Sequence, residues 1–289
     1  MAGDQRERGR CMSGERLRGK VALVTGAGRR GGLGEAICAR LAQEGASVVV
    51  SDVAGPRGAL PADRIGNRSE LDAVVATLRE SGARAVACEL DVRDEAQAES
   101  AVALAVREFG GLDILVNNAG IGFMMEPLVD MPLERWNTVI GVNLTGAFLC
   151  TQHASRQMIR QGRGGRIINI ASVAAKSGSL HLAAYSSSKH GMIGLTRSAA
   201  LELGAHRITV NAICPNHVTT QLGAVQNAYR ATQRGQTVEA YLAEMRGRIP
   251  LGRVGLAEDT AKACAFLCSD EAQYVTGEAM NVSGGQEMH

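Results

Sequence analysis

Aromatic side chains, long apolar runs and net charge of either sign are all scarce in this sequence of 289 residues. Only 3% of the residues are aromatic, whereas Gly, Ala and Val are abundant, which favours close helix–sheet packing over a β-sandwich. No run approaches the about 18 apolar residues that a membrane-spanning helix needs, so we expect none. A formal net charge of +2 gives no reason to expect a nucleic-acid or membrane partner.

The N-terminal segment also lacks the apolar core of a secretory signal. Its many charged residues predict a disordered tail over residues 1–18. The seven Cys are odd in number and scattered, which indicates free thiols in a reducing cytoplasm. Cys264 and Cys268 lie four residues apart on one predicted helix. Without a second pair of ligands, we expect them to be buried small side chains, and we predict no metal site.

Short apolar runs alternate with helical patterns along the rest of the chain. Strands are predicted over residues 20–28, 46–52, 83–91, 112–120, 165–172, 207–215 and 277–285. Helices are predicted over residues 34–45, 69–82, 95–110, 134–162, 183–204 and 258–270, with Ser69 as a helix N-cap. This alternation predicts an α/β fold with a doubly wound parallel sheet that carries helices on both faces.

The stretch TGAGRRGGLG, residues 25–34, closes the first predicted strand and opens the first predicted helix. Glycine in such a turn lets a pyrophosphate approach the backbone amides at the positive end of the helix. This position between a strand and a helix indicates a dinucleotide-binding turn in a Rossmann-type sheet. Because no linker interrupts the pattern, we interpret residues 19–289 as a single dinucleotide-binding domain.

Further motifs follow the glycine turn in order. Asp91–Val92 ends the third predicted strand, and NNAG (117–120) ends the fourth. Ser172 lies 13 residues before the tyrosine of YSSSK (185–189), and CPNHVTT (214–220) closes the sixth strand. Together these motifs resemble the classical short-chain dehydrogenase/reductase family over about residues 19–285. The resemblance implies a nicotinamide-dependent oxidoreductase.

The glycine turn is two residues longer than the T-G-x-x-x-G-x-G of that family. Two alignments fit. Thr25-Gly26 can keep the strand-end role, with two inserted residues before Gly32 and Gly34. Alternatively, Gly28, Gly32 and Gly34 take the three glycine positions. We favour the first alignment because Thr25-Gly26 directly ends the apolar strand.

The resemblance implies four catalytic residues: Asn143, Ser172, Tyr185 and Lys189. Tyr185 and Lys189 share a helix face because they lie four residues apart. A free tyrosine has a pKa near 10, but a neighbouring ammonium and a positive nicotinamide both favour the phenolate. Tyr185 would then exchange a proton with the substrate hydroxyl as hydride moves to or from the nicotinamide. In the family, Lys189 would also bind the nicotinamide ribose, Ser172 would stabilise the substrate oxygen, and Asn143 would position a water that joins Lys189 to solvent.

The same resemblance predicts the cofactor-binding residues, and one of them bears on which nicotinamide is used. Asp52 ends the second strand, where a carboxylate binds both adenosine ribose hydroxyls and repels a 2′-phosphate. We therefore expect NAD(H) to be favoured over NADP(H). Arg29 and Arg30, in the inserted part of the turn, are expected to bulge outward as solvated charges; contact with the adenosine-side phosphates is the alternative. The full predicted set is Gly26, Gly28, Gly32, Leu33, Gly34, Asp52, Asp91, Val92, Asn118, Ala119, Gly120, Tyr185, Lys189, Pro215, Val218 and Thr220.

Three features depart from the family pattern. Asn216 replaces the glycine after Pro215, and because Asn tolerates a left-handed backbone, the turn is expected to survive. Residues 53–69 form a longer connection than usual, marked as irregular loop by its Gly and Pro residues. Residues 221–253 occupy the place of the variable substrate lid. The polar residues of this lid, with His181 and the loop 122–128, favour a polyol- or sugar-like substrate.

Other functions stay open on the sequence alone. A simple ketone reductase or a 3-oxoacyl reductase-like enzyme is the alternative within the family. An epimerase or dehydratase could use the same scaffold, and a non-catalytic nucleotide-binding regulatory protein is the alternative from another class. The resemblance also implies a cytoplasmic homotetramer that acts on a small alcohol or ketone, with a dimer as the second choice of assembly.

Overall fold

The computed structural model describes residues 15–55, 65–122, 124–218 and 220–289. The predicted tail up to residue 14 and the middle of the predicted 53–69 loop lie outside the described residues. Within the described part of the chain, no helix is both long enough and apolar enough to cross a membrane.

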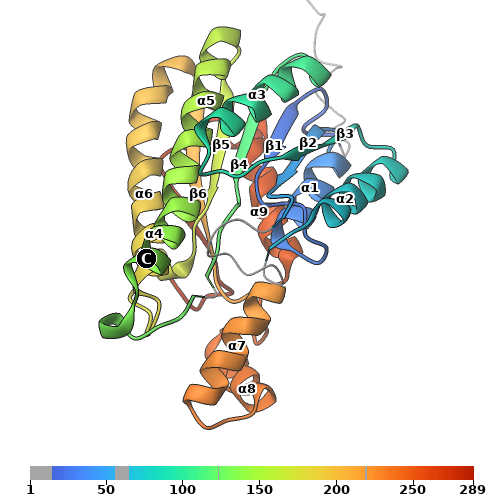
Figure 1. Ribbon diagram of the computed structural model, residues 1–289. Coiled ribbons are helices and arrows are strands. Elements are labelled where there is room, and N and C mark those ends of the chain that lie inside the picture. Colours follow the sequence, from blue (N-terminus) through green and yellow to red (C-terminus); the bar gives the residue numbers. More distant parts are fainter. Residues whose placement is uncertain (1–14, 56–64, 123, 219) are drawn as a thin grey trace, which may run out of the picture.

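A parallel sheet of seven strands forms the centre of the molecule (Figure 1). Its order is β3-β2-β1-β4-β5-β6-β7, so the direction of winding reverses between β1 and β4. Ligands of such sheets bind outside the carboxyl ends of the strands at this reversal. The structure therefore confirms the doubly wound Rossmann-type fold. The strands are β1 Val21–Val24, β2 Ser47–Asp52, β3 Ala85–Glu89, β4 Ile114–Asn117, β5 Gly165–Ile170, β6 Ile208–Pro215 and β7 Ala279–Val282.

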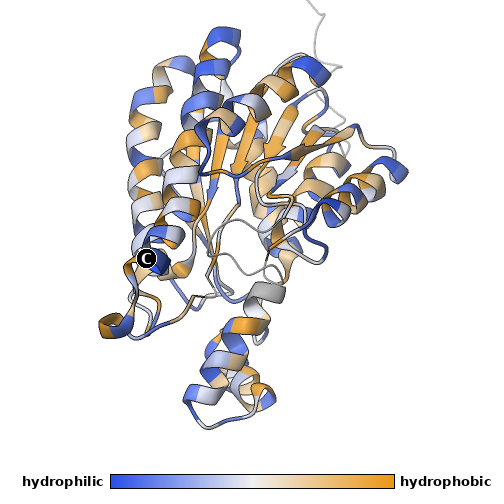
Figure 2. Cartoon of the chain, in the orientation of Figure 1, coloured by the Kyte–Doolittle hydropathy of each residue, from blue (hydrophilic) through white to orange (hydrophobic). Residues whose placement is uncertain are grey.

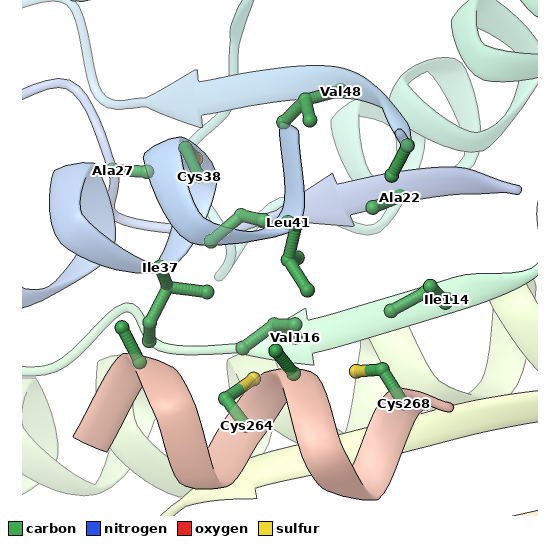
Figure 3. Close-up of a cluster of buried hydrophobic side chains, with 14 of the residues drawn as sticks. Ala22, Ala27, Ile37, Cys38, Leu41, Val48, Ile114, Val116, Cys264 and Cys268 are labelled. Carbon is green, nitrogen blue, oxygen red and sulfur yellow. The ribbon is translucent and has the colours of Figure 1, made fainter. Parts of the chain in front are cut away.

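Helices cover both faces of the sheet and bury its apolar strands, as the colours of Figure 2 show. One face carries α1 (Leu33–Gln43), α2 (Arg68–Glu80) and α9 (Ala257–Cys268). Figure 3 shows α1 and α9 packed on this face, with Ile37, Val116 and Cys264 among the contacts. The other face carries α3 (Glu95–Phe109), α4 (Leu133–Ile140), α5 (Gly146–Gln161) and α6 (Ala183–Leu203). Short 3₁₀ turns occur at Leu128–Asp130, Val173–Ala175, Gly204–His206 and Asp270–Ala272.

The predicted helix 134–162 is divided in two by a π-helical turn over Gly141–Thr145, between α4 and α5. Such turns are frequent at functional sites, and this one carries Asn143. Gly146, the first residue of α5, packs directly against the loop after β3, because a Cβ there would lie 2.4 Å from Cγ2 of Val92. A periodicity of 3.6 does not reveal one extra residue in a helix, so the sequence alone predicted a single helix.

The predicted substrate lid contains two helices, α7 (Gln221–Gln233) and α8 (Val238–Arg248). They project from the end of the molecule where the strands have their carboxyl ends (Figure 1). Thr220 and Thr237 cap them, because their side chains accept hydrogen bonds from the backbone N–H groups of Gly223 and Ala240. The lid therefore forms one wall of any site at the carboxyl ends of the sheet.

Two predicted boundaries were wrong. Residues 15–18 are part of the fold and not of a tail, because Leu17 is fully buried and its N–H donates to the carbonyl of Glu44 at 2.8 Å. One apolar residue in a charged stretch is a weak signal in the sequence. The N-cap of α2 is Asn67 and not Ser69: the Asn67 side chain accepts the N–H of Glu70 at 3.0 Å, and its amide donates to the Glu70 carboxylate at 3.1 Å.

Candidate active site

A cavity of about 590 Å³ lies at the carboxyl ends of the strands and extends beneath α7 and α8. The glycine turn, the ends of β2 and β4, and the start of α6 all contribute to its wall. The structure thus brings together all but two of the predicted site residues. The wall includes Gly26, Gly32, Leu33, Gly34, Asp52, Asp91, Val92, Asn118, Ala119, Gly120, Ser172, Tyr185, Lys189, Pro215, Val218 and Thr220.

The glycine turn is held against the end of β4 by very close backbone packing. Gly26 has a φ of 63°, and a Cβ on it would lie 2.5 Å from the Cα of Ala119. The Asn118 side chain donates to the carbonyls of Thr25 and Gly26 at 2.9 and 2.8 Å. In return, Thr25 Oγ1 accepts the N–H groups of Asn118 and Ala119. These contacts support the alignment in which Thr25-Gly26 keeps the strand-end role.

Gly28, one of the two predicted residues outside the cavity wall, positions Asp52. Its N–H donates to Asp52 Oδ2 at 2.8 Å, and the N–H of Val53 donates to Oδ1 at 2.8 Å. A Cβ on Gly28 would lie 2.7 Å from the Cβ of Asp52, so no larger residue fits. Burial raises the pKa of Asp52 to about 6, while these two hydrogen bonds and the charge of Arg29 oppose that rise. At neutral pH the carboxylate is therefore ionised in the cavity wall.

The two arginines of the inserted turn differ from each other. Arg30 is exposed, as expected, with its Nε 4.0 Å from a carboxylate oxygen of Glu35. The expectation of a solvated charge was wrong for Arg29, which is half-buried in the cavity wall with its charge close to Asp52. Gly66 leaves the room for this arrangement, because a Cβ there would lie 3.3 Å from Cγ of Arg29 and 3.2 Å from Cγ of Asp52.

Tyr185, Lys189 and Ser172 form the catalytic side of the cavity. Tyr185 and Lys189 lie one turn apart near the start of α6, and the Lys189 Nζ is 5.8 Å from the centre of the Tyr185 ring. Burial raises the pKa of Tyr185, and its hydrogen bond with Ser172 opposes that rise. Burial lowers the pKa of Lys189 to about 8, and its Nζ donates to the carbonyl of Ile170 at 2.6 Å. The phenol and the ammonium are therefore both held with little contact to bulk water.

Asn143, the other predicted residue outside the cavity wall, is fully buried behind it. Its Oδ1 accepts the N–H of Ile121 at 2.8 Å, and its Nδ2 donates to the Ile121 carbonyl and to Ser188 Oγ at 3.0 Å each. Ser188 Oγ in turn donates to the carbonyl of Tyr185 at 2.7 Å. A Cβ on Gly120 would be 3.5 Å from both Asn143 Oδ1 and Lys189 Nζ, so both side chains lie next to this glycine.

Several residues of the cavity were not predicted. Ser188 joins Asn143 to the helix of Tyr185, but a serine between Tyr and Lys carries no signal of that role. Gln286 and Glu287 also line the cavity, and Gln286 is hydrogen-bonded to Asn216. Asn216 does not adopt a positive φ, so the expectation of a left-handed backbone there was wrong. Its amide instead joins the C-terminal segment, a contact between residues 70 apart in the sequence.

Comparison with known proteins agrees with this architecture. A family model described as "Enoyl-(Acyl carrier protein) reductase" matches residues 26–287. The 3-oxoacyl-[acyl-carrier-protein] reductase of Aquifex aeolicus is 38% identical over 270 residues, which are 93% of this chain and 98% of that protein. Carveol dehydrogenase from Mycobacterium avium, solved in complex with NAD, is 34% identical with a TM-score of 0.86, over 94% of this chain and 99% of that one. An NAD⁺-bound xylitol dehydrogenase is 35% identical with a TM-score of 0.85, over 94% and 100% of the two chains.

The extent of these matches and the Rossmann-type sheet define the class of protein. This chain belongs to the short-chain dehydrogenase/reductase family of oxidoreductases. Two of its structural relatives carry NAD, which supports the use of NAD(H) in this family.

Proposed function

We propose that this protein interconverts a secondary alcohol and a ketone by hydride transfer, with Tyr185 as the general acid/base. The observation that carries the proposal is the meeting of Tyr185, Lys189 and Ser172 in the same cavity wall as the glycine turn and Asp52. Because a nucleotide-binding protein without turnover has no need of a buried ammonium beside a partly buried phenol, this arrangement favours an enzyme.

The residues around the cavity fit a dinucleotide. The turn approaches β4 so closely that only glycine fits at position 26. The helix α1 begins directly after Gly32, so its unpaired amide groups face the region where a pyrophosphate would bind. The ionised carboxylate of Asp52 lies on the adenosine side. We propose that these residues hold NAD(H) in preference to NADP(H), with Val218 and Thr220 on the nicotinamide side.

The chain's own residues supply the proton chemistry. A bound nicotinamide gives or takes the hydride and, when oxidised, adds a positive charge to the site. Burial raises the pKa of the Tyr185 phenol, and the Ser172 hydrogen bond opposes that rise. The ammonium of Lys189, 5.8 Å from the centre of the ring, is proposed to favour the phenolate as well. In the oxidation direction, Tyr185 Oη then takes the proton of the substrate hydroxyl, and it returns that proton in the reduction. The Ser172 hydroxyl stabilises charge on the substrate oxygen.

Asn143 is proposed to act on the catalytic side chains through the residues that it contacts. Its amide fixes the backbone of Ile121 and, through Ser188, the first turn of α6. We propose that it also orders a water that lets Lys189 exchange protons with solvent, because both side chains lie next to Gly120. It is thus a positioning residue for Lys189 and Tyr185.

The substrate is proposed to be polar. Gln226 and Arg230 of α7 line the cavity, and the Gln226 side chain donates to the carbonyl of Gly122 at 2.8 Å. These groups support a hydroxylated, polyol- or sugar-like alcohol, and the resemblance to xylitol dehydrogenase agrees with it. A 3-oxoacyl substrate is the second candidate, supported by the similarity to the reductase of Aquifex aeolicus. The six described cysteines are free, which supports the proposed cytoplasmic location.

Absorbance at 340 nm tests the proposal directly. Purified protein is mixed with NAD⁺ and a panel of polyols, sugars and secondary alcohols, or with NADH and the matching ketones and a 3-oxoacyl thioester. We expect turnover of at least one alcohol–ketone pair in both directions. Binding of NADH without any turnover across the panel would contradict the proposal and favour a non-catalytic nucleotide-binding protein.

A further inference from the structure

One arginine of the lid lacks a partner although it lines the cavity. The side chain of Arg230, on α7, has no hydrogen bond or ion pair with any of the residues that the structure describes, and the residue is only partly exposed. Two other arginines of the lid do have ion-pair partners. Arg234 lies 3.0 Å from the carboxylate of Glu244, and Arg248 is paired with the same carboxylate. A half-buried cation without a counter-ion costs free energy, because it loses hydration without gaining a partner.

Among the described residues, no carboxylate forms an ion pair with Arg230. The charge of Arg230 acts on the pKa of His217. Burial and that charge lower the pKa to about 4, so the imidazole is neutral at pH 7. The Glu287 carboxylate, also in the cavity wall, lies 3.0 Å from Nδ1 of His289 and forms no ion pair with Arg230. On the lid, Arg230, Arg234 and Arg248 carry three positive charges against the single negative charge of Glu244, so this part of the cavity wall is positive. The His217 Nε2 is buried and has no hydrogen-bond partner among the described residues, so a second polar atom is available there.

The position of Arg230 relative to the catalytic tyrosine follows from α7. Gln226 lies one turn before Arg230, and its amide donates to the carbonyl of Gly122. Gly122 packs against Tyr185: a Cβ there would lie 2.9 Å from Cε2 of the ring and 3.0 Å from Nε2 of Gln226. The side chain of Gln226 is thus beside Tyr185, and Arg230 is about one helical turn, roughly 5–6 Å, further along α7.

We propose that the substrate carries a carboxylate, bound by Arg230 at a distance of several bonds from the carbon that exchanges hydride. This inference rests on the proposed function and narrows its substrate class to hydroxy acids and keto acids. A carboxylate matches the fork of a single guanidinium, and its single charge matches the single unpaired cation. Arg234 and Arg248 are both in contact with the carboxylate of Glu244, so Arg230 is the arginine of this part of the cavity wall that is available for such a group. His217 Nε2 can add a hydrogen bond to the bound group.

Binding of matched probes by calorimetry tests the proposal. Cyclohexanecarboxylate and its neutral counterpart of similar shape, cyclohexanecarboxamide, are titrated at pH 7.5 into the full chain with saturating NAD⁺. We expect the wild-type protein to bind the carboxylate at least tenfold more tightly. Arg230→Gln should weaken carboxylate binding by about ten- to hundredfold, the value of a charge-assisted hydrogen bond, and remove the preference over the carboxamide. Arg230→Lys should keep part of that preference.

Arg246→Gln is the matched control, because Arg246 lies on α8, is exposed and does not line the cavity. It should bind both probes as the wild type does. Equal affinities of the wild type for the two probes, no binding of the carboxylate, or an unchanged preference in Arg230→Gln would overturn the proposal. Tighter binding of cyclohexyl phosphate than of the carboxylate would overturn the assignment of a monocarboxylate. Because the readout is binding, a failure of the proposed catalysis would show only in the 340 nm assay.

Discussion

At the scale of single residues, Asp52 and Arg29 lie close together, with opposite charges, in the part of the cavity wall that we propose holds the adenosine. Asp52 is fixed by two backbone N–H groups at the end of β2, whereas Arg29 is held in the inserted part of the turn. A 2′-phosphate near Asp52 would meet a like charge, at a cost of about 1–4 kcal/mol at intermediate dielectric. Arg29 would attract the same phosphate. The choice of nicotinamide therefore depends on the balance of these two side chains.

We expect kcat/KM for NAD(H) to exceed that for NADP(H) by roughly tenfold or more, because the Asp52 carboxylate is fixed in place. Asp52→Ala should narrow or reverse the ratio, since Arg29 would then face the 2′-phosphate without a competing carboxylate. The double variant Asp52→Ala/Arg29→Ala should lose the gain in NADP(H) activity. Steady-state kinetics with both cofactors measures each ratio. A wild-type preference for NADP(H) that disappears in Arg29→Ala would instead make the arginine the selector.

At the scale of elements, the sequence predicted more of the strands than of the helices. Each of the seven strands lies within its predicted range, because a strand buried on both faces needs a short continuous apolar run. The π-helical turn at Asn143, the start of α2 and the two lid helices were missed. The π-helical turn depends on one inserted residue, the start of α2 on a local hydrogen bond, and the lid helices on contacts across the cavity. None of these changes the pattern of apolar residues in the sequence.

The residues of the candidate active site also divide into those that the sequence predicted and those that it did not. The glycine turn, Ser172, Tyr185 and Lys189 could be predicted because each occupies a fixed place at the end of a strand or on one helix face. The half-burial of Arg29 and the contact of Gln286 with Asn216 could not, because both join residues that are distant in the sequence. The lack of an ion-pair partner for Arg230 among the described residues could not be predicted either, since a sequence does not show which charged side chains form pairs.

The cap of α2 gives an element-scale prediction. Asn67→Ala removes the acceptor for the Glu70 N–H and should lower the free energy of unfolding by about 1 kcal/mol. Ser69→Ala, two residues along in the same turn, is the control and should change it by less than about 0.5 kcal/mol. Urea denaturation followed by circular dichroism compares the two variants. A larger loss in Ser69→Ala than in Asn67→Ala would restore Ser69 as the cap.

At the scale of the whole molecule, large apolar side chains are exposed on two neighbouring helices. Phe148 and Ile159 of α5 are 44% and 38% exposed, and Leu201 of α6 is 86% exposed. β7 is also the last strand of the sheet and pairs with β6 alone among the described strands, and Tyr274, shortly before it, is fully exposed. Apolar surface and a free strand edge both favour burial against another copy of the chain. These surfaces support a homotetramer, with a dimer as the second choice.

Light scattering at micromolar concentration tests the assembly. We expect a mass of about four times the 30.3 kDa of the chain. Leu201→Glu should shift the protein toward smaller species, because it would place a charge in the apolar surface that the proposed assembly buries. A wild-type protein of the mass of one chain would contradict the assembly without bearing on the catalytic residues.

The central claim is that Tyr185 moves the proton when hydride is transferred, and Tyr185→Phe tests it most directly. The substitution removes the phenolic oxygen but keeps the ring that packs against Gly122. Turnover with the best substrate from the 340 nm panel should fall by roughly 10²–10⁴-fold, the usual loss when an acid–base group is removed. The dissociation constant for NADH, measured by its fluorescence, should change less than about threefold, since the glycine turn and Asp52 are untouched. Turnover near the wild-type level in this variant, with NADH still bound, would show that another group moves the proton.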